Sequence, residues 1–147
     1  MKVEVINNQS VIRLSKIRIK NIVKSVITFE NRVCDEVAIH LVNTKKICEL
    51  HQQFFNDPST TDCISFPIDD FNDAYCHIGE VFVCPQTAVD YSKDHHADVY
   101  QEITLYIVHG LLHLMGYDDI QKKDRIKMRN AEKRHLANLK KLNITLN

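Results

Sequence analysis

EITLYIVHGLLHLMGYDD, the sequence of residues 102–119, predicts a helix that is apolar on nearly every side. From Glu102 to Met115 its only charged side chain, the histidines aside, is that of Glu102. A helix that is apolar all round is buried in the core of a protein, so we expect this one to run through the centre of the domain. Its two histidines, His109 and His113, would then lie on the best-buried element of the fold.

The two histidines have the spacing of a pair of metal ligands. Residues four apart lie one turn from each other on the same face of a helix, so both imidazoles can bind one ion. Gly116 allows the chain to leave the helix through a left-handed turn, which can bring a residue ten positions after His109 back to the ion. Asp119 occupies that position, and Asp118 is the competing carboxylate. The spacing favours Asp119 as the third ligand.

The pattern H-x3-H-x2-G-x2-D has the geometry of the metzincin zinc site, with an aspartate in place of the last histidine. Three protein ligands with an open position for water are typical of catalytic zinc, whereas structural zinc normally has four ligands. Aspartate is a harder ligand than imidazole, so it can reduce the preference for zinc or admit other divalent ions. The sequence therefore predicts one zinc ion per chain, held by His109, His113 and Asp119.

The residue after the first histidine argues against a peptidase. Zinc peptidases place a glutamate there as general base, whereas Gly110 has no side chain that can carry a proton. A bound metal would still lower the pKa of its water to about 7 and polarise a phosphoryl oxygen. RNA also has an internal nucleophile in its 2′-hydroxyl, so cleavage of its phosphodiester bonds has less need of a strong protein base.

The composition indicates one soluble domain. The 147 residues are 44% hydrophobic, which is enough for a core, and we expect a single domain over residues 1–147. The charged N-terminus is unlike a signal peptide, and no run of about 18 apolar residues predicts a membrane span. Five cysteines without a C-x-x-C pair indicate reduced thiols. We therefore expect a cytoplasmic protein that contacts no membrane.

The net charge of zero conceals an uneven distribution of charge along the chain. Residues 1–29 carry six basic and one acidic side chain, residues 30–120 carry four and sixteen, and residues 121–147 carry nine and two. Both basic ends are predicted to be helical, so they could form a basic surface that attracts a phosphate backbone. The alternative is two ordinary solvated helix faces, because no aromatic residues alternate with the basic ones.

Alternating and helical patterns divide the rest of the chain into short elements. Strands are predicted over residues 2–6, 37–41, 63–66 and 78–84. Helices are predicted after the N-caps Ser10, Asn43 and Asp98, over residues 86–93 behind Pro85, and over residues 121–140. Residues 12–19 can also be interpreted as an alternating strand. The apolar stripes of the second and last helices are predicted to be Ile47, Leu50 and Phe54, and Ile126, Ala131, Leu136 and Leu139.

Three segments of the chain resemble a known family. HGLLHLMGYDD, residues 109–119, resembles the signature H-G-x-L-H-L-x-G-Y-D-H of the YbeY family of bacterial rRNA-maturation factors and departs from it at the last position. TDCISFP, residues 61–67, resembles the family's T-N-V-L-S-F-P segment, and IGEVFVCP, residues 78–85, resembles its L-G-D-I-V-I-C-P strand. The order and spacing of the segments fit, so the resemblance covers most of the chain.

The resemblance implies an α+β fold with a small, mostly parallel four-stranded sheet, a central ligand-bearing helix and surrounding helices. It implies a metal-dependent, single-strand-specific endoribonuclease of 16S rRNA 3′-end processing and ribosome quality control. The implied partners are ribosomal RNA and the small ribosomal subunit, and no DNA is expected. The family's three histidine ligands map to His109, His113 and Asp119. The acidic residues of the other two segments are Asp62 and Glu80, and neither is assigned a catalytic step.

One departure from the family concerns a cation. The family places an arginine linked to activity shortly before its T-N-V-L-S-F segment, but that position falls on Phe55, and no arginine lies between Arg32 and Arg125. The missing cation could come from Lys45, Lys46 or the basic C-terminal helix. A second hypothesis is therefore a ribosome-associated assembly factor with a mainly structural metal and little or no nuclease activity. A third hypothesis is a zinc peptidase, against which Gly110 argues.

Overall fold

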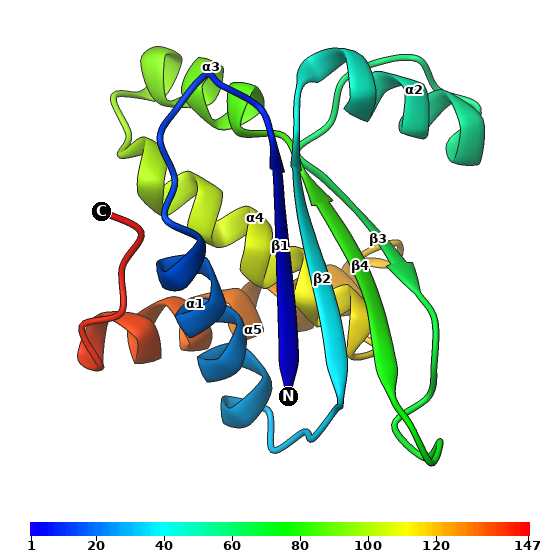
Figure 1. The fold of residues 1–147 in the computed structure, drawn as a ribbon. Helices are drawn as coiled ribbons and strands as arrows, with labels where there is room; N and C mark the ends of the chain where they lie inside the picture. Colours follow the sequence, from blue (N-terminus) through cyan, green and yellow to red (C-terminus); the bar gives the residue numbers. More distant parts are fainter.

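The computed structural model describes residues 1–147 and contains one four-stranded sheet and five helices (Figure 1). The strands are β1 (Lys2–Asn8), β2 (Glu36–Val42), β3 (Cys63–Pro67) and β4 (His77–Val83). The helices are α1 (Lys16–Phe29), α2 (Thr44–Phe55), α3 (Pro85–His95), α4 (Val99–Leu114) and α5 (Lys122–Lys141). The strand order is β1-β2-β4-β3, with β3 antiparallel to β4 and the other pairs parallel. The expected α+β fold with a small, mostly parallel sheet is confirmed.

The central position of α4 is also confirmed. Figure 1 shows α1, α3, α4 and α5 on one side of the sheet, with α2 apart from them. α4 contacts β3, β4 and the helices α1, α3 and α5, so it is enclosed by the rest of the fold. Its side chains Ile103, Ile107 and Leu111 are fully buried and share one core cluster with Ile39 and Val81 of the sheet. Burial of apolar area on both sides of α4 therefore holds the layers together.

Gly110 allows α4 to approach the sheet closely. A Cβ atom at this position would lie 2.4 Å from Val81 Cγ1 and 3.2 Å from Ser65 Oγ, both of which belong to the sheet. The Ser65 hydroxyl donates a hydrogen bond of 2.8 Å to the Gly110 carbonyl and so ties β3 to α4. A glutamate side chain at position 110 would have no room here. The close packing of α4 on the sheet therefore explains why position 110 carries no glutamate.

Most predicted helix ends are observed. Asn43 and Asp98 are N-caps, because their side chains accept hydrogen bonds from Lys46 N and from Tyr100 N and Gln101 N, respectively. Pro85 is the first residue of α3, as its fixed φ favours. All five cysteines are free. None of the five helices combines the length and the hydrophobicity that a bilayer-spanning helix requires.

The prediction that Ser10 is the N-cap of the first helix is wrong. The first helix begins after Ser15, whose hydroxyl accepts a hydrogen bond from Arg18 N, and Ser10 lies in an irregular loop. The Gln9 side chain folds this loop by donating to the Ile12 carbonyl and accepting from the Ile12 amide. The alternating pattern of residues 12–19 forms no strand: the Gln9 side chain bonds the backbone of Ile12, and residues 16–19 form the first turn of α1.

Two residues of the predicted apolar stripes face solvent. Phe54 is 54% exposed and contacts Phe66 edge to face, and Ile126 is 52% exposed. On α5, Ala131 and Leu139 are buried as predicted and Leu136 packs against the core, while Met128, Glu132 and His135 are buried in addition. The inner face of α5 therefore also includes a carboxylate and an imidazole that were not predicted, and Ile126 lies outside it.

The substitution Gly110→Ala tests the close approach of α4 to β4. The added Cβ would overlap the stiff, β-branched Val81, so we expect the free energy of unfolding to fall by about 1–3 kcal/mol. Chemical denaturation of the two proteins measures this change. In the double variant Gly110→Ala, Val81→Ala the overlap is relieved, so its loss of stability should be smaller than the sum of the two single losses. Additive losses would contradict the close contact.

Candidate metal centre

The structure brings the three predicted metal ligands together at the end of α4. The Nε2 atoms of His109 and His113 lie 3.1 Å apart, as expected for residues one helical turn from each other. Asp119 lies in the loop before α5, and its Oδ2 is 3.5 Å from His109 Nε2 and 3.3 Å from His113 Nε2. All three ligand atoms are within 4.8 Å of one another, so one ion could contact them all.

The turn after α4 positions Asp119. Gly116 has φ +99°, a conformation that residues with a Cβ rarely adopt, and a Cβ there would meet no other atom within 4 Å. Glycine is therefore required at position 116 by the backbone conformation and not by a lack of space for a side chain. The turn is closed by hydrogen bonds of 3.0 Å from Tyr117 N to Leu112 O and 3.1 Å from Gly116 N to His113 O. The predicted left-handed exit from the helix is confirmed.

Asp118 has a different role from Asp119. Its Oδ1 accepts hydrogen bonds from the backbone N–H groups of Asp119 and Ile120, at 2.7 and 3.4 Å. This capping arrangement fixes the loop, and the Asp118 carboxylate is engaged by the two backbone N–H groups that follow it. Of the two carboxylates that the sequence offered, the one that joins the histidines is Asp119.

The loop is also anchored to the two basic helices. The Tyr117 hydroxyl donates a hydrogen bond of 2.7 Å to Glu30 at the end of α1 and accepts one of 3.3 Å from Arg134 of α5. Glu30 also lies 3.3 Å from His135 Nε2, and His135 is only 1% exposed. The position of Asp119 therefore depends on contacts with residues distant in the sequence.

Each ligand histidine is oriented through its second ring nitrogen. His109 Nδ1 lies 3.0 Å from Glu132 Oε2 on α5, and His113 Nδ1 lies 3.1 Å from the Tyr117 carbonyl. Both partners are acceptors, so each Nδ1 carries the hydrogen and each neutral ring has its lone pair on Nε2. The two Nε2 lone pairs then face each other beside the Asp119 carboxylate. This is the donor set that a divalent cation stabilises, so the residues present fit a metal ion.

Charge near His109 favours its protonated form. Burial alone would lower the pKa of His109, but the hydrogen bond and charge of Glu132, with the charges of Asp62 and Asp119, outweigh it, so that the pKa is raised. A metal ion must displace this proton, because it binds the neutral imidazole. Metal affinity is therefore expected to fall as the pH falls through the raised pKa of His109.

One side of the centre remains open. The side chains of His109, His113 and Asp119 are 22, 28 and 40% exposed. A pocket of about 140 Å³ adjoins His109 and Asp119. Its other polar lining residues are Asp62, Tyr106, Arg125, Arg129 and Glu132. A ligand in this pocket would lie next to an ion held by the three side chains.

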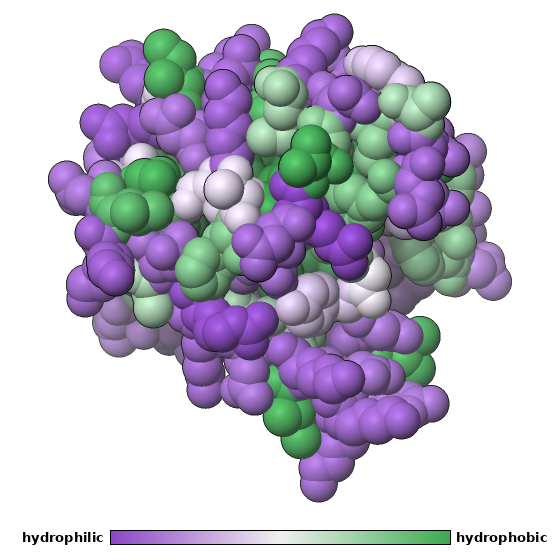
Figure 2. All heavy atoms as spheres, turned by 90° about the horizontal axis from the view of Figure 1, so that it is seen from below, coloured by the Kyte–Doolittle hydropathy of each residue, from purple (hydrophilic) through white to green (hydrophobic).

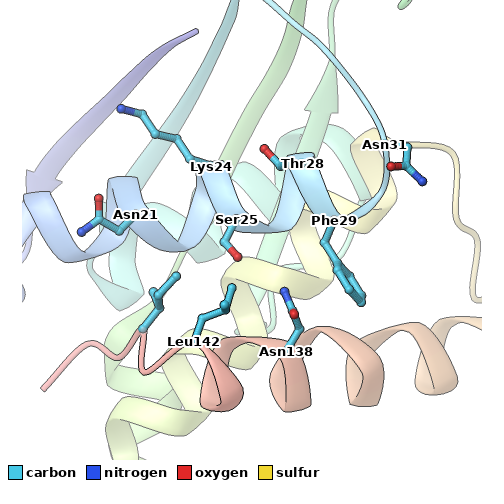
Figure 3. A pocket seen from close by; sticks show the side chains of 9 residues that line it. Asn21, Lys24, Ser25, Thr28, Phe29, Asn31, Asn138 and Leu142 are labelled. Atoms are coloured by element: carbon cyan, nitrogen blue, oxygen red, sulfur yellow. The ribbon is translucent and has the colours of Figure 1, made fainter.

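A larger hollow lies elsewhere in the molecule. It has a volume of about 780 Å³ and lies between α1 and the C-terminal end of α5 (Figure 3). Lys24 is its one charged lining residue, and no histidine, cysteine or carboxylate side chain lines it. This hollow offers no metal ligand, so the chemistry of the chain is concentrated at the smaller pocket beside His109.

The structure shows which of the residues that could supply the missing cation lie near the candidate metal centre. Phe55 is 58% exposed at the end of α2, where its ring meets His51 edge to face. Lys45 lines a different pocket together with residues of the loop after β1. None of these three positions, 45, 46 and 55, lines the pocket beside His109. Arg125 and Arg129 of the basic C-terminal helix do line it. Of the sources named from the sequence, α5 therefore reaches the site.

Glu132 contacts the centre but was not predicted from the sequence. It is one of two acidic residues in α5, whose other charged residues are nine lysines and arginines, and it is 6% exposed. A single carboxylate at a buried position of a basic helix was a signal that it pairs with something inside the fold. The two acidic residues of the family-like segments differ: Asp62 lines the site pocket, whereas Glu80 pairs with His40 at 2.8 Å and does not line that pocket.

The substitution Glu132→Gln tests how the histidine is oriented. Glutamine keeps the size and an acceptor oxygen but removes the charge that makes His109 a stronger donor to the metal. We expect zinc affinity to fall about 10- to 100-fold, as measured by competition with a chromogenic zinc chelator. The matched control is Asp124→Asn, which removes the other acidic charge of α5 outside this pocket. Equal affinities in both variants would contradict the role of Glu132.

Comparisons with known proteins identify the family of the chain. A family model described as endoribonuclease YbeY matches residues 4–140. The endoribonuclease YbeY of Protochlamydia amoebophila is 52% identical over 94% of this chain and 93% of its own, and that of Chlamydia pneumoniae is 36% identical over 96% and 92%. The solution structure of TM1509 from Thermotoga maritima superposes with a TM-score of 0.63 at 25% identity, covering 91% of this chain and 86% of that one. The chain therefore belongs to the endoribonuclease YbeY family.

Proposed function

We propose that this chain is a zinc-dependent endoribonuclease that cleaves single-stranded RNA. The observation that carries the proposal is the convergence of His109 Nε2, His113 Nε2 and Asp119 Oδ2 beside an open pocket that contains two arginines. The names of the relatives, endoribonuclease YbeY, support the reaction type. The substrate is ribosomal RNA at the 3′ end of the 16S species, and the small ribosomal subunit in the cytoplasm is the partner.

The ligand set supports zinc as the ion. His109, His113 and Asp119 would hold it, and two imidazoles with one carboxylate suit zinc better than magnesium or calcium, which prefer oxygen ligands. When bound, such an ion lowers the pKa of a water molecule and polarises a phosphoryl oxygen. Glu132 and the Tyr117 carbonyl keep the two imidazoles in the required tautomer and orientation.

The surface around α5 supports a polyanionic substrate. Seven of its basic residues are exposed in the first two thirds of the helix, namely Lys122, Lys123, Arg125, Lys127, Arg129, Lys133 and Arg134. Seen from below the view of Figure 1, the surface of the molecule is mainly hydrophilic, with smaller hydrophobic groups between (Figure 2). The positive charges of these seven residues attract the phosphate backbone of RNA and do not distinguish its sequence.

Cleavage of RNA by the metal-loaded protein is the direct test. The purified, zinc-loaded chain should cut single-stranded fragments of 16S rRNA, and both a chelator and His113→Ala should abolish the cutting, because either removes the ion. His95→Ala, an exposed histidine outside the site, should leave it unchanged. Gel analysis of end-labelled fragments measures the products. Equal cleavage by wild type and His113→Ala would exclude the metal from the mechanism. A folded, zinc-loaded wild type that cuts nothing would instead favour the assembly-factor hypothesis.

Variants of Asp119 test the identity of the third ligand. Asp119→Ala should weaken zinc binding, since two imidazoles then remain, and Asp119→His should increase the preference for zinc over manganese, because imidazole is the softer ligand. Binding constants for both metals are measured by competition with a chelator. Asp118→Asn is the matched control, since it keeps an oxygen acceptor for the loop amides. A wild-type affinity in Asp119→Ala would refute Asp119 as a ligand.

A further inference from the structure

Arg129 lies beside the candidate metal centre and has no partner of its own. It lines the pocket next to His109 and Asp119 and is exposed. The neighbouring arginines of α5 are both engaged: Arg125 donates a hydrogen bond of 2.6 Å to the Ile120 carbonyl, and Arg134 donates one to the Tyr117 hydroxyl. The Arg129 side chain forms no hydrogen bond or ion pair. Its guanidinium is therefore available to a ligand in the pocket.

The periodicity of α5 places Arg129 on the side of the metal ligands. Glu132, which contacts His109, follows Arg129 by three residues, and residues three apart share a helix face. Arg125 precedes Arg129 by four residues and therefore shares the same face, where its bond to Ile120 fixes the loop directly after Asp119. Arg125 thus holds the loop, and Arg129 lies between Arg125 and Glu132 on the same face of α5 and lines the pocket.

The pocket needs a cation if it is to accept a phosphate group. Three carboxylates line it, those of Asp62, Asp119 and Glu132, and the last two contact imidazoles of the centre. A phosphate oxygen approaching these groups is repelled unless positive charge is close. The guanidinium of arginine is planar, permanently charged and able to donate two parallel hydrogen bonds to phosphate oxygens. Arg129 is the side chain in this pocket that is free to do so.

We infer that Arg129 binds the phosphate group at the cleavage point of the RNA and holds it against the centre formed by His109, His113 and Asp119. This inference rests on the proposed function, because it assigns the residue that positions the substrate for the reaction. Arg129 touches the substrate, whereas Arg125 acts by holding the Asp119 loop. The cation expected from α5 is thereby assigned to one residue.

Three single variants test this assignment in the zinc-loaded protein. Arg129→Gln removes the charge, Arg129→Lys keeps the charge without the planar fork, and Lys141→Gln removes one charge from the last turn of the same helix, outside the pocket and outside the proposed RNA-binding surface. The first readout is the binding of inorganic phosphate, measured by calorimetry. The second is cleavage of a short single-stranded RNA, from which kcat and KM are obtained separately. Zinc affinity and the melting temperature are measured for each variant, so that loss of the ion or of the fold is distinguished from loss of the phosphate contact.

Arg129→Gln should lower phosphate affinity and reduce kcat/KM by on the order of 100-fold, the loss typical of one stabilising donor at a developing charge. Arg129→Lys should lie between this variant and the wild type, and Lys141→Gln should remain close to the wild type. Unchanged phosphate binding in Arg129→Gln, or equal losses in Arg129→Gln and Lys141→Gln, would overturn the inference. A wild type that binds phosphate through Arg129 but cuts no RNA would support the phosphate site and reject the proposed function.

Discussion

The close packing of α4 on β4 at Gly110 is the constraint on which the candidate centre depends. The space for a Cβ at Gly110 is occupied by Val81, and the Gly110 carbonyl is tied to Ser65. Because this side of the helix faces the sheet, the rotation of α4 is fixed. His109 and His113, on another side of the same turns, are then directed toward α5 and the Asp119 loop. The same residue that excludes a peptidase glutamate thus orients both imidazoles.

Acceptors outside the ligand set complete the centre. A buried carboxylate is stable only with a partner, and Glu132 finds its partner in His109 Nδ1. The Tyr117 carbonyl, returned by the left-handed turn at Gly116, does the same for His113. Both contacts direct the Nε2 lone pairs to one point, so the protein is organised for an ion before the ion arrives. Proton and metal then compete for the same nitrogen of His109.

Local features could be predicted from the sequence, and tertiary ones could not. The spacing of His109, His113 and Asp119, the caps Asn43 and Asp98, and the turn at Gly116 are set by residues close in the chain, and the structure bears out their geometry. The start of α1 was misplaced because Ser10 and Ser15 are equally good caps and the choice depends on the loop built by Gln9. Glu132 was missed because the rotation of α5 is decided by its contact with α4, about which periodicity says nothing.

The charges of the pocket couple metal binding to phosphate binding. Asp62, Asp119, Glu132, Arg125 and Arg129 line it, so three negative groups face two positive ones, and with neutral imidazoles and no ion the pocket has a net charge of minus one. A divalent ion reverses the sign and leaves one net positive charge, which matches the single negative charge of a phosphodiester. By linkage, a phosphate that binds more tightly in the presence of the ion must tighten the ion to the same degree. An aspartate as third ligand adds one negative charge to the centre, and the arginines of α5 offset it.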